Sequence, residues 1–525
     1  MPETSLKAGR KEWIALCVLM LPLLLVAMDL SVVYYAVPYI TEQLKPSTTQ
    51  QLWMFDAYGF VLASLYITMG AVGDRIGRRK LLLIGATVFG IGSVLAGYSQ
   101  SSEMLIFARV LQAVGGATLE PTALALLRSM FRDPAERSKA VAIFVGTLGV
   151  GVTVGPVMGG LLLAHFWWGS IFLINVPFML MLLVTAPLLL PESRNPNAGR
   201  FDLFSAFLTV AAIFPLVFGV KEIAANGTST PSLVYIGVSV LAIILFVIRQ
   251  ARASHPMLDM SLLRRRNISG PVVTKLVGSF GLIGFAVFTT QYLESVQGRS
   301  PLNAALWSLV PSIGVGIAQP TTLALVQRGM KRAYVISFCF AMALGGFLIM
   351  SQLNVDSGLW VILLAMTLQA GGLVSVMGQC TDMLVASVTE AEAGSGTAVL
   401  ETASLLGGSL GMALLGSVGA HIYRTDMQAA LPSDLDPTVY QSARDTLGGA
   451  IVAAQHLPDA TGRQVLAVGR EAFTHGLNVA ALAVSGIAFV AIILVSLVLR
   501  SVPNPTVAAD DERSVDDTTP VGASS

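Results

Sequence analysis

The chain has 525 residues, of which 54% are hydrophobic and only 12% are charged, whereas about 25% of residues are charged in an average soluble domain. This composition excludes a water-soluble protein of this length, and the net charge of +1 gives no indication of a nucleic-acid partner. Gly is frequent, with 50 residues, as expected where membrane helices pack closely. We therefore predict an all-α integral membrane protein.

The apolar segments, taken in chain order, predict about fourteen membrane-spanning helices, because a span needs about 20 mainly apolar residues. The predicted spans are residues 13–38, 52–73, 81–99, 103–127, 138–164, 169–190, 203–222, 232–249, 270–293, 302–326, 333–352, 358–384, 396–421 and 476–499. Residues 251–269 form a basic linker. Residues 422–475 form a long loop whose apolar spacing predicts short helices. From residue 503 the chain is acidic, and we expect this tail to be disordered.

The positive charges give these spans an orientation, since cytoplasmic segments carry an excess of Lys and Arg. With the N-terminus inside, most of the 32 Lys and Arg fall in cytoplasmic segments, including the cluster at 264–266. Only Arg109 and Lys275 fall within spans. Lys275 is expected to extend its amine to the cytoplasmic surface. Both termini are therefore predicted to be cytoplasmic.

Charged residues inside the spans are the first candidates for function, because each costs about 2.5–3.5 kcal/mol on insertion scales. Asp29 and Arg109 lie at similar depth on the first and fourth spans, and an ion pair between them would relieve both costs. A functional role is favoured for this pair and for Glu401. For Asp56, contact with headgroup water is as well supported as a functional role. For Glu120, a packing role is as well supported as a functional one.

A glycine-rich turn between the second and third spans has the sequence G-A-V-G-D-R-I-G-R-R-K, from Gly70 to Lys80. It resembles the G-x-x-x-D-R-x-G-R-K signature of the major facilitator superfamily. Its glycines permit a tight turn, and the aspartate can pair with an arginine or cap a helix. The candidate gating residues of this turn are Asp74, Arg75, Gly77 and Arg78.

Two further motifs lie on the fourth and fifth spans. The pattern L-x-x-x-R-x-x-Q-x-x-G around Arg109 resembles the family motif whose arginine takes part in proton coupling. Gly151, Gly155, Pro156 and Gly159 resemble the antiporter motif, which is characteristic of exporters. Glycines at this spacing form a flat ridge for close helix contact, and the proline removes one backbone hydrogen bond.

Two segments resemble the fourteen-span drug:proton antiporters, the branch with quaternary-ammonium and multidrug efflux pumps of the QacA type. Residues 29–38 are similar to D-x-T-x-x-N-x-A-L-P, with Tyr34 in place of the asparagine, and residues 172–177 are similar to F-x-I-N-x-P. In the thirteenth span, Glu401 stands where the branch commonly has an amide, and a positive charge is missing. This difference favours cationic substrates.

The resemblance implies a major facilitator fold in a bacterial cytoplasmic membrane. Residues 1–195 and 259–502 would form two six-helix bundles, residues 196–258 two inserted helices, and residues 503–525 the tail. Transport would proceed by alternating access in a monomer. The proton gradient would supply the energy, with no cofactor or metal. The implied partners are protons, membrane lipids and small lipophilic cations, with no nucleic acid.

In this scheme Asp29, tuned by Arg109, exchanges protons, while Asp56, Glu401 and Glu120 attract and release the cation. Aromatic side chains can add cation–π contacts worth about 0.5–2 kcal/mol, although packing is an equal alternative for each. The candidate aromatics are Tyr34, Tyr58 and Trp307.

Other functions remain open to different degrees. An exporter of one antibiotic or metabolite fits the same motifs, and a proton symporter fits them less well. A membrane-embedded enzyme is not supported, since the five His are scattered near helix ends and neither H-E-x-x-H, G-x-S-x-G nor a Walker A motif is present.

Overall fold

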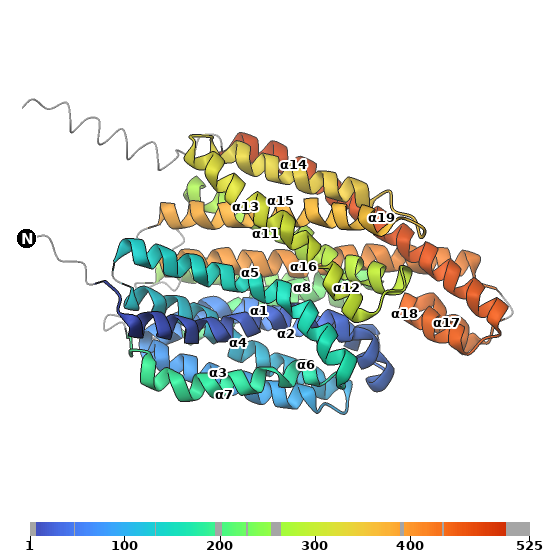
Figure 1. Cartoon of the computed structure of the whole chain (residues 1–525), viewed down its shortest axis with the longest axis horizontal. Helices are drawn as coiled ribbons and strands as arrows, with labels where there is room; N and C mark the ends of the chain where they lie inside the picture. The colour runs from blue at the N-terminus through green and yellow to red at the C-terminus, as the bar shows by residue number, and fades with distance from the viewer. Residues whose placement is uncertain are drawn as a thin grey trace, which may run out of the picture.

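The computed structural model describes residues 7–46, 48–131, 133–194, 202–226, 229–253, 264–388, 393–432 and 435–499. The regular secondary structure of these ranges is entirely helical (Figure 1). Within them, eleven helices are long and apolar enough to cross a membrane. Shorter apolar stretches lie in three further helices, at Ala57–Tyr66, Val154–His165 and Phe204–Val220. The prediction of an all-helical membrane protein is confirmed.

A first group of helices, here the N-terminal group, extends to residue 189. It consists of α1 (Arg10–Leu44), α2 (Thr48–Ile76), α3 (Arg78–Gly97), α4 (Ser102–Met130), α5 (Pro134–His165) and the broken helix α6–α7 (Ser170–Leu173 and Asn175–Leu189). The first helix packs against the fifth, the second against the fourth, and the third against the fourth and the last. Leu, Ala and Phe side chains fill the core between them.

A second group, the C-terminal group, repeats this order of contacts. It consists of α11 (Arg266–Gln291) with its π-helical extension η1 (Tyr292–Val296), α12–α13 (Pro301–Trp307 and Val310–Gln327), α14 (Arg332–Met350), α15 (Leu359–Ser387), α16 (Ala393–Ala430) and α19 (Asp459–Val498). Here too the first helix packs against the fifth (α11 and α16), and α15 contacts both α13 and α14. The two groups therefore share one internal architecture.

Between these groups in the chain lie α8 (Leu203–Asn226) and α9 (Thr230–Arg252). They pack against each other, and α8 also contacts both α2 and α16, so it covers one seam between the groups. On the α2 side of this seam the indole of Trp53 stacks on Phe214 and Phe218, with 5.3 Å between ring centroids in each case. Most apolar side chains of α9 are exposed, as expected for a lipid-facing helix.

The segment 422–475 is more helical than the sequence predicts. The expected short helices are present as α17 (Pro437–Asp445) and α18 (Leu447–Gln455), but α16 continues to Ala430 and α19 begins at Asp459 instead of near 476. The extensions are held by packing: the Tyr423 hydroxyl donates to the Ala443 carbonyl over 2.9 Å, and α18 packs on α19. This unit projects beyond the bundle (Figure 1).

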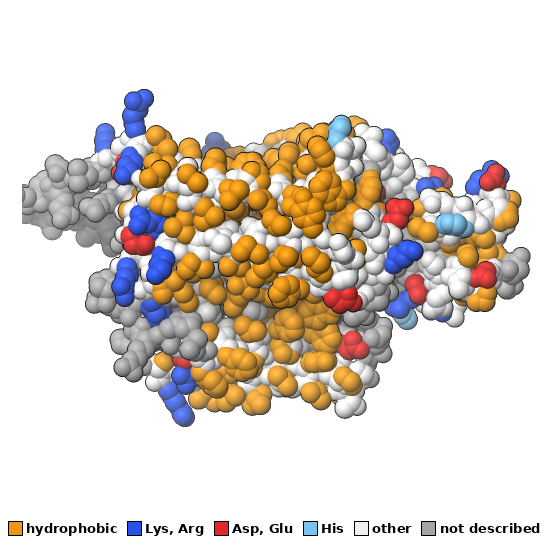
Figure 2. Space-filling view, turned by 90° about the horizontal axis from the view of Figure 1, so that it is seen from below, with side chains coloured by type: hydrophobic (Ala, Val, Ile, Leu, Met, Phe, Trp, Pro, Cys, Tyr) orange, Lys and Arg blue, Asp and Glu red, His pale blue; other side chains and the backbone are white. Residues whose placement is uncertain are grey.

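The surface of the bundle is divided into a belt and two ends. Figure 2 shows apolar side chains over the middle, Lys and Arg gathered at the end where α1 begins, and mixed charges at the other end. We call these the basic end and the opposite end. Most of the linker at 251–269 and the tail from 503 lie outside the described residues, and α11 begins at Arg266.

Candidate functional site

The centre of the N-terminal group holds a fully buried ion pair between α1 and α4. Asp29 is 0% exposed and Arg109 is 2% exposed. The Arg109 Nη1 donates to Asp29 Oδ2 and, over 3.1 Å, to Gln112 Oε1. The Arg109 Nε also donates to the Met54 carbonyl of α2, over 3.4 Å. The pairing predicted from the equal depth of the two charges is confirmed.

The pair is the core of a larger buried network. The Asn175 amide, at the start of α7, donates to Asp29 Oδ1 and to Ser93 Oγ, each over 3.3 Å. The Gln112 amide donates to the same Ser93 Oγ over 2.9 Å. The motifs contained Gln112 and Asn175 without giving either a role, and Ser93 was missed. Its only signal in the sequence is a hydroxyl in an otherwise apolar span.

Aromatic rings from α2 and α6 pack against the guanidinium of this network. The Tyr58 ring is fully buried, with its centroid 4.3 Å from Arg109 Cζ, and the Phe172 ring lies 5.6 Å away. The predicted cation–π role of Tyr58 therefore has an internal partner, the guanidinium. Trp307 is on α12 and is 39% exposed. The side chains of Tyr34 and Asp56 lie outside the described part of the structure.

The C-terminal group contains a second ion pair, between α11 and α16. The Lys275 Nζ lies 2.6 Å from Glu401 Oε1 and also donates to Thr381 Oγ1 over 3.4 Å. The prediction that Lys275 extends to the surface is wrong, because its side chain is only 5% exposed. A buried ammonium needs an anionic partner, and Glu401 supplies one within the span. The Glu401 side chain itself is 27% exposed.

Glu120 brings a second acid near this pair from the N-terminal group. It accepts a hydrogen bond from the Tyr66 hydroxyl of α2 and interacts electrostatically with Glu401 and Lys275. Leu405, one turn along α16 from Glu401, packs against the core of the N-terminal group. Two acids that the sequence predicts on separate helices are therefore neighbours across the seam between the groups.

The groups also meet toward the opposite end. The Tyr35 hydroxyl of α1 lies 3.1 Å from Ser308 Oγ, directly after α12. At Gly160 of α5 the backbones are so close that a Cβ would come within 2.9 Å of Leu302 Cα. The two groups are therefore in direct contact toward that end.

The glycine motif of α5 forms the contact with α1. A Cβ would lie 2.7 Å from the Leu24 carbonyl oxygen if added at Gly151, and 2.9 Å from the Met28 carbonyl oxygen if added at Gly155. A Cβ at Gly159 would lie 2.7 Å from Val32 Cγ2, and Pro156 lies within this helix. The close packing predicted from the spacing is confirmed.

The equivalent contact of the C-terminal group uses Gly407 and Gly411 of α16. A Cβ at either position would collide with α11 backbone, at Leu276 and Phe280. This second ridge was not predicted from the sequence. Its signal is the same spacing of four residues on the fifth helix of the group.

The turn between α2 and α3 lies at the basic end. Gly77 has φ +109°, a conformation that favours glycine, and the Arg78 backbone N–H donates to the Ser193 carbonyl over 2.9 Å. The turn is thereby fastened to the segment after α7. Arg75 lies at the end of α2, and the side chain of Asp74 is outside the described part of the structure. The proposed pairing of Asp74 with Arg78 stays a prediction.

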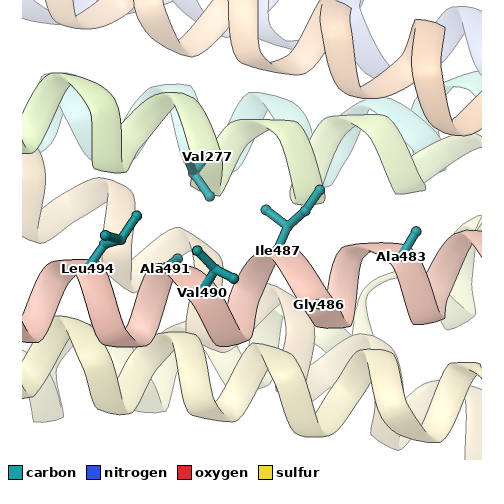
Figure 3. A pocket seen from close by; sticks show the side chains of 7 residues that line it. All are labelled: Val277, Ala483, Gly486, Ile487, Val490, Ala491 and Leu494. Carbon is teal, nitrogen blue, oxygen red and sulfur yellow. The ribbon is translucent and has the colours of Figure 1, made fainter.

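A cavity of about 360 Å³ lies between α11 and α19 (Figure 3). Its lining is apolar, and Ile487, Val490 and Leu494 are 38–54% exposed on the outer surface of the bundle. It offers no polar group for an ion and is suited to a lipid chain, so we do not assign it to the site.

Comparison with known proteins assigns the family. Residues 19–412 match the model of the Major Facilitator Superfamily. The chain is 38% identical to the multidrug efflux pump LfrA of Mycolicibacterium smegmatis, over 93% of this chain and 98% of that protein. The chain belongs to the major facilitator superfamily. It is accordingly a membrane transporter and not an enzyme.

Other relatives and a solved structure agree. The tetracenomycin C resistance and export protein of Streptomyces glaucescens is 32% identical, over 93% of this chain and 92% of its own. The methyl viologen resistance protein SmvA of Salmonella typhimurium is 30% identical, over 90% and 94%. A bacterial homologue of the human lysosomal transporter Spinster, solved inward-facing and unoccupied, has a TM-score of 0.63 at 16% identity, covering 94% of this chain and all of the other, which shows the shared fold.

Proposed function

We propose that this transporter is a proton-coupled antiporter that exports cationic amphipathic compounds, such as quaternary ammonium ions, dyes and antiseptics. The observation that carries the proposal is the arrangement of buried charges. Asp29 is buried against Arg109 within one group, while Glu120 and Glu401 meet at the seam where the groups must separate. A carboxylate that is taken out of water must hold a cation or a proton, which makes the two competitors for it.

The proposed architecture is fourteen spans with both termini in the cytoplasm. It is supported by the eleven long apolar helices together with the shorter apolar stretches in α2, α5 and α8. The gathering of Lys and Arg at the end where α1 begins supports a cytoplasmic position for that end in a bacterial plasma membrane (Figure 2). The two groups would be the rocking bundles, with α8 and α9 inserted between them in the chain.

In the proposed cycle the arrangement described here, closed toward the opposite end, receives the cation from the cytoplasmic side at Glu401 and Glu120. Rocking of the groups then exposes these acids to the outside. A proton taken up at Asp29 loosens its pair with Arg109 and allows the return. One proton exchanged for one monovalent cation is electrically neutral, whereas a second proton would add about 2.3 kcal/mol per 100 mV of membrane potential.

A second candidate function is the export of one specific antibiotic or metabolite. It is favoured by the relatives that carry such names, among them the tetracenomycin C exporter and the puromycin resistance protein of Streptomyces alboniger, which is 30% identical over 82% of this chain. Drug export would be indicated by efflux of several unrelated cations, and specific export by efflux of one compound alone.

The proposal is tested by efflux of ethidium from cells that express the protein or one of three variants, Asp29→Asn, Asp56→Asn and Glu401→Gln, at matched expression. We expect loss of efflux in the Asp29 variant and weaker efflux in the other two. Collapse of the pH gradient should abolish efflux by the wild-type protein. Efflux that persists without any proton gradient would contradict the proposal.

A further inference from the structure

Lys275 is a buried charged residue within the spans that neither the motifs nor the proposed cycle use. Its ammonium is buried between α11, α15 and α16 and contacts Glu401 over 2.6 Å and Thr381 over 3.4 Å. Lys275 is 4% exposed as a residue, so water does not replace these contacts. The candidate cation-binding carboxylate thus already holds a cation, which the protein supplies itself.

The pair is asymmetric in a way that leaves the acid accessible. The side chain of Glu401 is 27% exposed, against 5% for Lys275. Glu401 lies toward the seam, where it interacts electrostatically with Glu120 and Tyr66 of the N-terminal group. A ligand arriving along the seam therefore meets the carboxylate, with the ammonium behind it.

We propose that Lys275 is a specificity-determining residue that acts as a tethered competitor for cationic substrates. In the absence of substrate its ammonium occupies the carboxylate of Glu401. When a cation binds, the ammonium remains close by and repels it. This inference rests on the proposed function, because it assumes that cations bind at Glu401.

The repulsion has a signature that depends on substrate charge. The Coulomb energy between Lys275 and a ligand is proportional to the charge of the ligand, so a dication loses up to twice the binding free energy that a monocation loses. If removal of the ammonium strengthens binding of a monocation by about threefold, binding of a matched dication strengthens by up to about ninefold. Lys275 therefore lowers the preference of the site for dications relative to monocations.

Ethidium and propidium provide the matched ligands, since both have the same phenanthridinium ring and carry one and two positive charges. Their Kd values are measured by fluorescence titration of the full-length protein in lipid nanodiscs at pH 7.5. For Lys275→Met we expect the ratio of the ethidium Kd to the propidium Kd to rise by more than about twofold and up to about threefold. Lys275→Arg keeps the charge and should leave the ratio within twofold of the wild-type value.

Three further variants separate charge from damage to the fold. Lys331→Met removes an exposed lysine at the start of α14 and should not change the ratio. Glu401→Gln leaves the ammonium unopposed and should shift the ratio in the other direction, against propidium. If Lys275→Met does not fold, the inference is tested by comparing Glu401→Gln with Lys275→Met plus Glu401→Gln, in which the ratio should be higher because the ammonium is absent. The double variant Lys275→Met with Glu401→Gln should shift the ratio less than Lys275→Met alone.

Wild-type protein that binds both dyes, with a ratio that stays within twofold in Lys275→Met or that is the same in Glu401→Gln and in the double variant, would overturn the inference and leave the proposed function intact. Binding of neither dye by the wild-type protein would overturn the proposed function, and the inference with it.

Discussion

The two groups of helices have the same order of contacts but place their buried ion pairs in different surroundings. In the N-terminal group, Asp29 accepts a hydrogen bond from Asn175, Arg109 donates one to Gln112, and the ring of Tyr58 covers the guanidinium. In the C-terminal group, the pair is open on one side. The exposed fraction is 0% for the side chain of Asp29 and 27% for that of Glu401.

In the proposed function, the sealed pair exchanges the proton and the open pair binds the cation. A sealed carboxylate is reached by a proton more readily than by an organic cation, whereas a carboxylate at the seam is accessible to both. The glycine ridges are equivalent in the two groups, with α5 against α1 and α16 against α11. The two groups therefore share their helix packing, whereas the surroundings of their buried carboxylates differ.

The largest effect is expected for Asp29→Asn, which tests the sealed pair. It leaves the guanidinium of Arg109 buried without a counter-ion, a change that costs about 3–5 kcal/mol in buried pairs. We expect ethidium efflux to fall by at least about tenfold and the Tm of the purified protein to drop. Replacement of both residues by neutral ones, Asp29→Asn with Arg109→Met, should recover part of the Tm without recovering efflux.

The glycine ridge of α5 provides the next test, since tight packing of α5 on α1 is part of the architecture that the two groups share. Gly155→Ala places a Cβ 2.9 Å from the Met28 carbonyl oxygen, and such overpacking costs about 1–3 kcal/mol. Gly146→Ala on the same helix is the matched control, because a Cβ there meets nothing within 4 Å. Thermal unfolding of both variants should show a loss of Tm for Gly155→Ala only. Equal Tm values would contradict the ridge.

The open pair should be less sensitive than the sealed one. The Glu401 side chain is 27% exposed, so this pair is less completely removed from water, and we expect Glu401→Gln to cost about 1–2 kcal/mol in the free energy of unfolding, below the cost of Asp29→Asn. The measurement is the difference in Tm between the two single variants at one pH. A larger loss of Tm for Glu401→Gln than for Asp29→Asn would contradict the expectation that the more deeply buried pair contributes more to stability.

An exposed ion pair that joins the inserted helices should contribute least to stability. Arg249 Nε lies 2.7 Å from Asp202 Oδ2, and the hydrogen bond from Arg249 lowers the pKa of Asp202 below its usual range. A lowered pKa in the folded state means that the stabilisation is complete above about pH 4 and is lost as the pH falls below it. Asp202→Asn should therefore cost less than about 1 kcal/mol at pH 7, with unchanged ethidium efflux.

The sequence predicted the helices well because hydropathy acts over whole segments. Each predicted span has a helix in the structure, and the motifs of α4 and α5 lie where the resemblance places them. The helical extensions of α16 and α19 were missed because their residues, such as Arg463 and Arg470, are too polar for a span. They are helical because α17 and α18 pack against them.

The candidate site was predictable only in part. Depth along the spans was sufficient to pair Asp29 with Arg109. It was insufficient for Lys275, whose partner depends on which helices are neighbours, and that is decided by the packing of α11 on α16. Uncharged members of the network, such as Ser93, carry no signal that separates them from other hydroxyls in apolar helices.

Proton-coupled export is tested most directly by transport in proteoliposomes that contain the purified protein and an imposed pH gradient. Wild-type protein should move ethidium against the direction of proton flow. Asp29→Asn should bind ethidium with a Kd near the wild-type value but give no transport in response to the gradient. Gradient-driven transport by Asp29→Asn at the wild-type rate would contradict the proposed role of Asp29 in proton coupling.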